Sequence, residues 1–245
     1  VRHRAIPDGG PVLEIGTGWV HWYSLYLRVF HRVTMTMVDV WDNRQLAAMK
    51  AMFADLREHP AAGFDQDGEA AAIVDSISSV GSFEELYDLL DLDYVIDGSG
   101  TLRGLASESF DTVFSFHVLE HVREQDTDEM IANMHRVLRP GGCSIHQIGI
   151  DDHLSHYDRA RESPKSYLQY SDGVWRAFFQ NDVQYFNRLQ MSDWLRAFRT
   201  HGFELVEHRA GSCNIDSLRI ARKYDGYSKE DLACTTLTIV CRKVA

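Results

Sequence analysis

Short apolar runs alternate with helical patterns over the first 150 residues of the chain. Five of these runs are rich in branched apolar residues and predict buried strands, at residues 12–15, 33–38, 93–96, 111–116 and 144–150. Apolar residues at helical spacing predict helices between these runs, at residues 23–30, 43–58, 83–90 and 130–138. Strands that alternate with helices are typical of a parallel sheet with helices on both of its faces.

The C-terminal part of the chain completes this pattern. Residues 191–200 predict a helix, residues 203–207 a sixth strand, and residues 235–241 a last strand with alternating apolar positions. We therefore predict an α/β fold, a doubly wound, Rossmann-like sheet of seven mostly parallel strands. One antiparallel strand is expected near its edge.

Local signals set several boundaries between these elements. Residues 61–72 are rich in alanine, glycine and acidic residues, and they predict a loop or surface excursion. Ser82 and Glu85 have the spacing of a capping box, which predicts that a helix begins at Phe83. The helix that ends near Leu138 is predicted to stop at a turn over residues 140–142, because a proline and two glycines do not continue a helix.

From residue 151 to about residue 188 the pattern becomes irregular and rich in aromatic residues: Tyr157, Tyr167, Tyr170, Trp175, Phe178, Phe179, Tyr185 and Phe186. We interpret residues 151–188 as an insertion after the fifth strand, within a single domain that spans residues 1–245. Three roles stay open for its rings. They form a lid over a flat or sugar-like acceptor, the core of a small helical subdomain, or a contact in a homodimer.

Composition and charge exclude several classes of protein. The 245 residues are 44% hydrophobic and 25% charged, which is ordinary for a globular domain. No apolar run approaches the roughly 18–20 residues that cross a bilayer. The net charge of −11, without a basic stripe, argues against nucleic acid as a substrate, because affinity for nucleic acid comes largely from cations that bind phosphates.

The cysteines indicate a reducing compartment. Four are scattered along the chain without Cys-x-x-Cys spacing, namely Cys143, Cys213, Cys234 and Cys241. This pattern is typical of free thiols rather than of a disulfide framework or a zinc site. A cytoplasmic enzyme is therefore the prediction. Residues 1–4 are basic, but no apolar signal core follows them, so they indicate no destination.

Distinctive residues follow the first four predicted strands. Residues 16–18 form a Gly-Thr-Gly turn, Asp39 ends the second strand, Asp97 follows the third and His117 the fourth. Ligands of open α/β sheets bind at the carboxyl ends of the strands, where these residues gather. A Gly-x-Gly turn followed by an acidic residue also opens dinucleotide-binding domains, so these positions alone indicate only a nucleotide-like ligand.

Three segments of the sequence indicate which nucleotide-like ligand is bound. Residues 12–18 resemble the first motif, Glu/Asp-x-Gly-x-Gly-x-Gly, of class I S-adenosylmethionine-dependent methyltransferases, although Trp19 and Val20 stand where the pattern ends in glycine. Residues 109–122 are similar to the fourth-strand signature of that family. Residues 135–142, His-Arg-Val-Leu-Arg-Pro-Gly-Gly, match the segment before its fifth strand. The resemblance covers residues 10–150 and disfavours a dehydrogenase.

The resemblance implies a site for S-adenosylmethionine formed by Glu14, Gly16, Thr17, Gly18, Asp39, Asp97 and His117. The turn at residues 16–18 would approach the methionine part of the cofactor, and Glu14 would hold either this turn or the amino group. Asp39 would accept hydrogen bonds from the ribose hydroxyls, and Asp97 would accept one from the adenine amino group. His117 would lie beside the cofactor, whose product is S-adenosylhomocysteine.

The acidic and histidine-rich segment 151–158 supplies candidates for the chemistry. Methyl transfer to a hydroxyl needs a group that removes the proton, and a neutral imidazole suits this task. We predict His153 as the base with Asp152 as its orienter, and His156 is the other candidate imidazole. Two alternatives stay open: Asp151 joins Asp152 and His153 around a divalent cation, or the segment is a polar loop with a capped helix start.

No metal site is expected from the sequence. His117 and His121 are four residues apart, but no third ligand is in view. His121 and Glu120 are interpreted as groups that stabilise the next helix or line the pocket floor. Residues 126–129 carry acids that suit the first turn of a helix.

Residues 151–153, the aromatic segment and residues 187–189 resemble methyltransferases found with bacterial surface-glycan genes. The predicted reaction is therefore O-methylation of a sugar or glycan end. Methylation of a natural-product or lipid-like acceptor at oxygen, nitrogen or carbon is the first alternative. A scaffold that binds the cofactor without transferring its methyl group is the alternative from another class.

Overall fold

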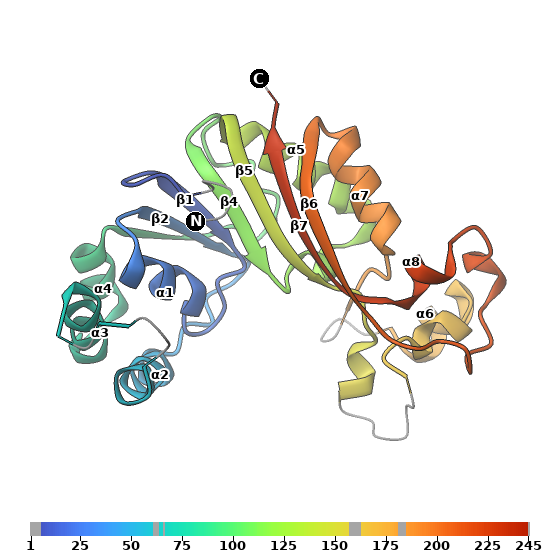
Figure 1. Cartoon of the computed structure of the whole chain (residues 1–245), viewed down its shortest axis with the longest axis horizontal. Coiled ribbons are helices and arrows are strands. Elements are labelled where there is room, and N and C mark those ends of the chain that lie inside the picture. Colours follow the sequence, from blue (N-terminus) through green and yellow to red (C-terminus); the bar gives the residue numbers. More distant parts are fainter. Residues whose placement is uncertain (1–5, 61–63, 66, 157–162, 181–184, 245) are drawn as a thin grey trace. The chain divides into compact units, whose positions relative to one another are not determined.

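The structure is a computed structural model that describes residues 6–60, 64–65, 67–156, 163–180 and 185–244 (Figure 1). The chain divides into two compact units. The first unit comprises Val1–Phe114 and Arg136–Cys143, and the second comprises Ser115–His135 and Ser144–Ala245. The predicted single domain, with an insertion or lid over residues 151–188, stays a prediction. Tyr157 and the rest of residues 157–162, like residues 181–184, lie outside the described residues.

Seven strands of the described chain form one sheet in the order β3-β2-β1-β4-β5-β7-β6. Their bounds are β1 Pro11–Ile15, β2 Thr34–Asp39, β3 Leu92–Ile96, β4 Phe110–Phe116, β5 Leu138–Gly149, β6 Phe203–Ser212 and β7 Cys234–Lys243. β1 and β3 both run parallel to β2, whereas β6 and β7 are antiparallel. This confirms the predicted α/β sheet of seven strands, mostly parallel with antiparallel pairing at one edge.

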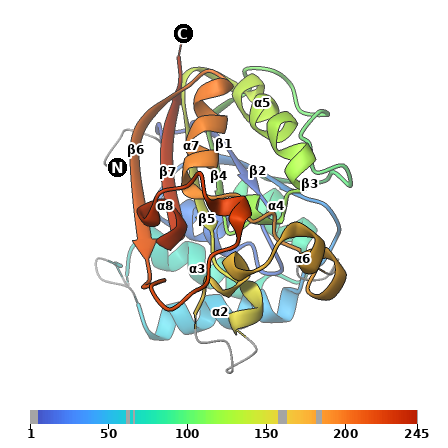
Figure 2. The same ribbon diagram turned by 90° about the vertical axis from the view of Figure 1, so that its right-hand side faces the viewer.

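The helices are α1 Trp22–Phe30, α2 Leu46–Glu58, α3 Glu69–Ser79, α4 Phe83–Leu90, α5 Thr127–Val137, α6 Asp172–Phe178, α7 Met191–Thr200 and α8 Lys229–Ala233. In the first unit, α1, α2 and α3 bury an apolar core around Leu25, Phe53 and Val74. In the second unit, α7 packs against β6 and β7 (Figure 2). None of the described helices is both long enough and apolar enough to cross a membrane.

The loop predicted over residues 61–72 is wrong at its C-terminal end, because α3 begins at Glu69. Ala71, Val74 and Ile77 repeat at three-residue spacing and form the buried face of this helix. The capping box of α4 is confirmed in part. The Ser82 hydroxyl accepts from the Glu85 N–H, while the Glu85 carboxylate accepts from Gly81 rather than from Ser82.

The predicted turn over residues 140–142 is also wrong, because β5 begins at Leu138, immediately after α5. The Ser109 N–H donates to the Val137 carbonyl (2.9 Å), so pairing starts where the helix ends. Arg139 then binds both carboxylate oxygens of Asp111 on β4, at 3.1 Å each. A β-carbon at Gly142 would lie 3.0 Å from the Asp111 carbonyl oxygen, so the glycine permits close strand pairing rather than a turn.

β6 runs to Ser212, five residues beyond its predicted end at Glu207. Its pairing with β7 continues through a register shift between Leu205 and Glu207. A bulge of this kind moves the side-chain alternation by one position, which hides the rest of the strand from a search for strict period two.

Most of the described rings of the aromatic segment are core residues of the second unit. Tyr167, Trp175 and Phe186 are each at most 4% exposed, and they pack with Tyr224 of the 3₁₀ helix at Arg222–Tyr224. Phe178, in contrast, is 78% exposed. The segment therefore contributes to a small apolar core that it shares with Ile215, Tyr224 and Leu232, and its role as a lid stays a prediction.

A buried lysine holds this core to the sheet. The Lys165 side chain is fully buried, and its Nζ donates to the carbonyl oxygens of Ile150 and Cys234, both at 2.8 Å. The same nitrogen lies 2.7 Å from the Tyr167 hydroxyl and 3.2 Å from Gln190 Oε1. The residue after β5, the first residue of β7 and the residue before α7 thus share one donor, the Lys165 Nζ.

Replacing this donor is expected to destabilise the protein. Lys165→Met removes the hydrogen bonds to Ile150 and Cys234 and leaves their buried carbonyls without that donor, which costs about 3 kcal/mol. Urea unfolding measures the change. Lys229→Met is the control, because Lys229 is exposed and pairs with Asp216 at the surface. Equal unfolding midpoints for the two variants would contradict the structural role of Lys165.

Candidate functional site

A buried carboxyl group organises the turn after β1 in the first unit. Glu14 is 1% exposed, and its Oε2 accepts hydrogen bonds from the Thr17 hydroxyl (3.1 Å) and from the Ser24 hydroxyl in α1. Gly16 and Gly18 have φ angles of +70° and +68°, which favour glycine. The structure therefore supports the first of the two roles expected for Glu14, that of holding the turn.

Burial raises the pKa of Glu14 to about 7, and the donated hydrogen bonds from Ser24 and Thr17 oppose this rise. The carboxyl group thus changes its charge near neutral pH. A cation close to this turn would favour the ionised form.

Asp39 at the end of β2 lies against the same turn. The Gly18 N–H donates to Asp39 Oδ2 (3.1 Å), and the Val40 N–H donates to Oδ1 (2.8 Å). A carboxylate oxygen has room for more than one donor, so the two oxygens can still accept a pair of hydroxyl groups. The parallel register places Asp39 opposite Ile96, one residue before Asp97.

Asp97 organises its own loop after β3. One of its oxygens accepts from the N–H (3.0 Å) and the hydroxyl (2.6 Å) of Ser99, and the other from the Leu102 N–H (3.0 Å). Burial raises the pKa of Asp97, but these hydrogen bonds outweigh it, so the net pKa is lowered. The backbone N–H of Asp97 donates to the Asp39 carbonyl (2.8 Å), which joins the two strand ends.

Exposed apolar side chains flank these two aspartates, and the sequence analysis did not find them. Val40 and Trp41 follow Asp39 and are 40% and 65% exposed, and Ile96, before Asp97, is 46% exposed. Large exposed apolar groups next to a polar site indicate a surface for a flat ligand. Their signal in the sequence was the apolar residue directly beside each strand-end acid.

Val20, which replaces the third glycine of the motif, does not disturb the turn. Its side chain packs against the apolar core of the first unit. Trp19 before it is 60% exposed. The chain enters α1 through His21, whose φ is +50°.

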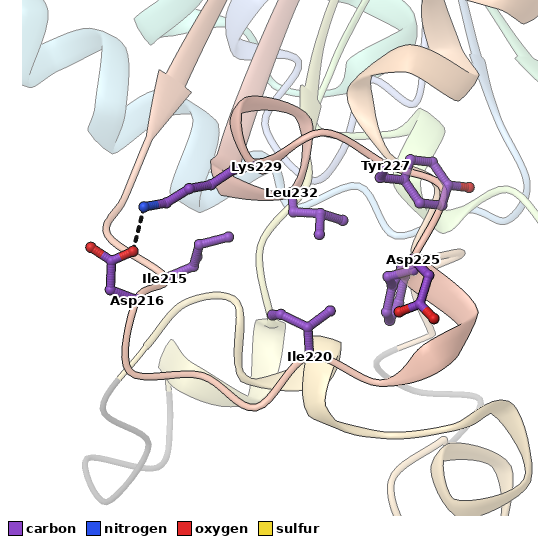
Figure 3. Close-up of a pocket in the computed structure, with 8 residues that line it drawn as sticks. Ile215, Asp216, Ile220, Asp225, Tyr227, Lys229 and Leu232 are labelled. Carbon is purple, nitrogen blue, oxygen red and sulfur yellow. Dashed lines mark hydrogen bonds and ion pairs between the residues drawn. The ribbon is translucent and has the colours of Figure 1, made fainter.

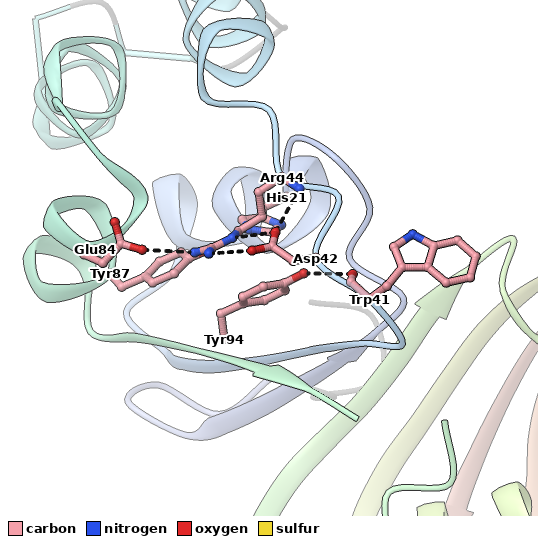
Figure 4. A network of polar contacts seen from close by, with 7 residues as sticks. All are labelled: His21, Trp41, Asp42, Arg44, Glu84, Tyr87 and Tyr94. Atoms are coloured by element: carbon pink, nitrogen blue, oxygen red, sulfur yellow. Dashed lines mark hydrogen bonds and ion pairs between the residues drawn. The ribbon is translucent and has the colours of Figure 1, made fainter. Parts of the chain in front are cut away.

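A cation stacked on aromatic rings fixes the loop after β2 (Figure 4). The Arg44 guanidinium lies 4.8 Å from the ring centroid of Tyr94 and 5.8 Å from that of Tyr87, and it pairs with Asp42 at 2.8 Å. His21 Nε2 lies 2.8 Å from the Tyr87 hydroxyl. Burial, assisted by the Arg44 charge, lowers the pKa of His21 to about 4, so this imidazole is neutral at pH 7.

In the second unit, His117 follows the end of β4 and contacts a buried carboxylate. Its φ is +53°, and its Nδ1 lies 3.0 Å from Oε1 of Glu120, a residue that is 1% exposed. The hydrogen bond to Glu120 raises the pKa of His117, and burial partly opposes the rise. The other ring nitrogen lies 3.3 Å from Gln147 Nε2.

Glu120 also belongs to a group that the sequence analysis missed. A carboxylate oxygen of Glu120 and one ring nitrogen each of His121 and His153 all lie within 4.8 Å of one another. The sequence showed no third ligand near His117 and His121, because His153 is more than thirty residues away. The structure brings it together with Glu120 and His121 rather than with the histidine pair first considered.

Asp152, the predicted orienter of His153, is fully buried and caps a 3₁₀ helix. Its Oδ1 accepts from the Leu154 N–H (3.0 Å) at the start of the helix His153–His156. This contact supports the alternative of a capped helix start. The His153 ring centroid lies 4.9 Å from that of His121 and 5.0 Å from that of Phe186. Its role as base stays a prediction, and the side chain of His156 lies outside the described part of the chain.

A separate pocket of about 360 Å³ lies in the second unit (Figure 3). Its apolar lining comes from Ile215, Ile220 and Leu232, and an ion pair between Lys229 and Asp216 stands at one side. None of the site residues predicted from the sequence lines this pocket.

A family model described as a methyltransferase domain matches residues 2–208. No curated protein matches the sequence. The match contains every site residue predicted from the sequence, including Asp39 and His153.

Solved structures share the fold at low sequence identity. An S-adenosylmethionine-dependent methyltransferase from Methanosarcina mazei is 15% identical, with a TM-score of 0.56 over 99% of this chain and 96% of that one. Phosphoethanolamine N-methyltransferase 2 of Haemonchus contortus, in complex with S-adenosylmethionine, is 14% identical, with a TM-score of 0.56 over 100% and 51%. The [4+2]-cyclase SpnF is 13% identical, with a TM-score of 0.55 over 100% and 78%.

The Glu14 carboxyl gives a testable pH dependence. Its pKa is about 7 in the folded chain and 4.5 as a free group. The folded state therefore keeps the proton that the unfolded state loses, and the free energy of unfolding falls as the pH rises from 4.5 to 7. The contribution is on the order of 3 kcal/mol.

Urea unfolding of the wild type and of Glu14→Gln between pH 5 and pH 8 measures this effect. The variant has no proton to lose, so its stability relative to the wild type should rise across this range. Glu58→Gln, at the exposed end of α2, is the control and should track the wild type. Parallel curves for Glu14→Gln and the wild type would show that Glu14 does not titrate in this way.

Proposed function

The chain belongs to the methyltransferase-domain family and is an S-adenosylmethionine-dependent methyltransferase, and on this premise we propose that it methylates an oxygen of a sugar or glycan end. The product of the cofactor is S-adenosylhomocysteine. The observation that carries the choice of oxygen is the pair of imidazoles, His121 and His153, in contact beside the carboxylate of Glu120. A hydroxyl acceptor must lose a proton, and such groups can take it.

We assign the cofactor contacts of the first unit to the ends of β1, β2 and β3. The N–H groups and small side chains of residues 16–18 face the methionine part, and Asp39 accepts the two ribose hydroxyls. Val40 and Trp41 offer the adenine an apolar surface, supported by the exposure of both side chains. Asp97 accepts the adenine amino group with a lone pair that its loop contacts leave over. His117, which follows β4, stays a candidate cofactor contact, as the sequence resemblance implies.

Glu14 acts on the cofactor through the turn that it holds. Its carboxyl is buried, and its Oε2 is bonded to Thr17 and Ser24. The positive amino group of the cofactor near this turn would favour ionised Glu14, so binding near pH 7 is coupled to release of a proton.

At the acceptor we assign proton removal to His153, with Asp152 holding the start of its helix. The methyl group moves in line from the cofactor sulfur to the acceptor oxygen, and orientation of the two atoms supplies much of the rate. A natural-product or lipid-like acceptor is the second candidate. The third is a scaffold without methyl transfer, and the cyclase of similar fold gives a reason to test it.

The partners and the compartment stay proposals. The net charge of −11 supports a small-molecule or glycan acceptor rather than nucleic acid. None of the four cysteines, all of them in the described part of the chain, forms a disulfide, which supports the proposed cytoplasmic location. A homodimer contact through the aromatic segment is proposed on the exposure of Phe178.

Calorimetry with S-adenosylmethionine tests the cofactor site. We expect Asp39→Ala to weaken binding by roughly 10–100-fold, because two hydroxyls lose a charged acceptor. Asp93→Ala, an exposed acid on β3, is the matched control and should bind as the wild type does. Unchanged affinity of Asp39→Ala, or tight binding of NAD alone, would refute the assignment.

Release of S-adenosylhomocysteine with a panel of sugar acceptors tests the base. His153→Gln should lower kcat by roughly 10²–10⁴-fold and leave the Kd for S-adenosylmethionine unchanged, since it removes a proton acceptor and no assigned cofactor contact. His208→Gln, exposed on β6, is the control. Full turnover by His153→Gln would exclude His153 from the reaction.

A further inference from the structure

Glu120, His121 and His153 form the one group of three potential metal ligands found among the described residues. Their ligand atoms lie within 4.8 Å of one another. Atoms bound to one ion at about 2.0–2.2 Å lie roughly 3–4 Å apart, so small side-chain rotations would bring all three to a common ion.

The Glu120 carboxylate has one oxygen in use and one without a partner. Oε1 accepts from the Gly149 N–H (3.0 Å) and contacts His117 Nδ1 (3.0 Å). Oε2 is buried and has no hydrogen-bond partner within the described chain. A buried carboxylate oxygen without a partner is costly, and a bound cation would satisfy it.

Gly149 at the end of β5 makes room for this carboxylate. A β-carbon at this position would lie 2.7 Å from Glu120 Oε1 and 3.0 Å from His117 Nδ1. The strand end therefore accommodates Glu120 only because residue 149 has no side chain. His117 and Gly149 both contact Oε1 of Glu120, which leaves Oε2 for a further ligand.

The orientation of His121 matches that of a metal ligand. Its Nδ1 lies 2.7 Å from the backbone carbonyl oxygen of Tyr185, and only a protonated nitrogen can donate to this acceptor. The lone pair of the neutral ring is therefore on Nε2. Histidines that bind metals usually donate their other N–H to a carbonyl or carboxylate in this way.

We propose that Glu120, His121 and His153 bind one divalent cation of the first transition row, such as Mn²⁺, Co²⁺ or Zn²⁺. Two imidazole nitrogens and one carboxylate oxygen form a ligand set that suits these ions. Three protein ligands leave coordination positions for water or for a hydroxyl group. His121 is exposed, so such a ligand can enter from solvent.

A role for the cation in the reaction rests on the proposed function. A hydroxyl held by a divalent cation loses its proton to solvent more readily, because the cation stabilises the resulting oxyanion. The oxygen–methyl bond forms as the sulfur–methyl bond of S-adenosylmethionine breaks, and S-adenosylhomocysteine leaves. With the cation bound, His153 is a ligand, and the cation takes the part otherwise given to the imidazole base.

Titration of the full chain with Co²⁺ tests the site, because visible absorption reports the ligands of this ion. We expect one Co²⁺ per wild-type chain, and His121→Gln should weaken binding by at least about tenfold. His208→Gln is the matched control and should bind as the wild type does. Thermal unfolding without metal checks that His121→Gln is folded, as its exposure predicts. Equal Co²⁺ binding by the wild type and His121→Gln, or no binding by the wild type, would overturn the site.

Chelation separates the site from the proposed function. Product formation that stops in a chelator and returns with Mn²⁺, while binding of S-adenosylmethionine persists, supports the role in the reaction. Full product formation after chelation overturns that role. Co²⁺ binding that depends on His121, without product from any sugar acceptor, supports the site and contradicts the proposed function instead.

Discussion

The carboxyl group of Glu14 lies at the end of β1, where it is almost fully removed from solvent and bonded to the hydroxyls of Thr17 and Ser24. These two hydrogen bonds join the end of β1 to the turn at residues 16–18 and to α1. Burial destabilises the charged form of an acidic group and raises its pKa. The hydrogen bonds from Thr17 and Ser24 stabilise the charged form and offset part of this rise. The conformation of residues 16–18 depends on this group, and so does the position of the Gly18 N–H that binds Asp39.

Parallel pairing aligns the ends of β1, β2 and β3. The register sets Ile15 beside Val38 and Asp39 beside Ile96, so three loops that are distant in sequence begin at one level. Hydrogen bonds then join them, from Gly16 to Val38 and from Asp97 to Asp39. In the second unit, hydrogen bonds likewise join the ends of β4 and β5, because Glu120 contacts both His117 and Gly149.

The sequence predicted those features that depend on local pattern. Strand periodicity sufficed to find the seven strands, because it is a short-range property of the chain. The site residue Asp39 was likewise predicted from a local feature, its place at the end of the second strand. The start of β5 at Leu138 was not predictable in this way, since it depends on the Arg139–Asp111 pair between two strands. The contacts of Arg44 with Tyr87 and Tyr94, and of His153 with His121, join segments dozens of residues apart, and no local pattern encodes them.

The central claim is that S-adenosylmethionine binds at the ends of β1, β2 and β3 in the first unit. A crystal structure of the chain with S-adenosylhomocysteine tests it most directly. We predict both ribose hydroxyls on the Asp39 carboxylate and the adenine against Val40 and Trp41. A cofactor bound instead in the pocket lined by Ile215 and Leu232 would contradict it (Figure 3).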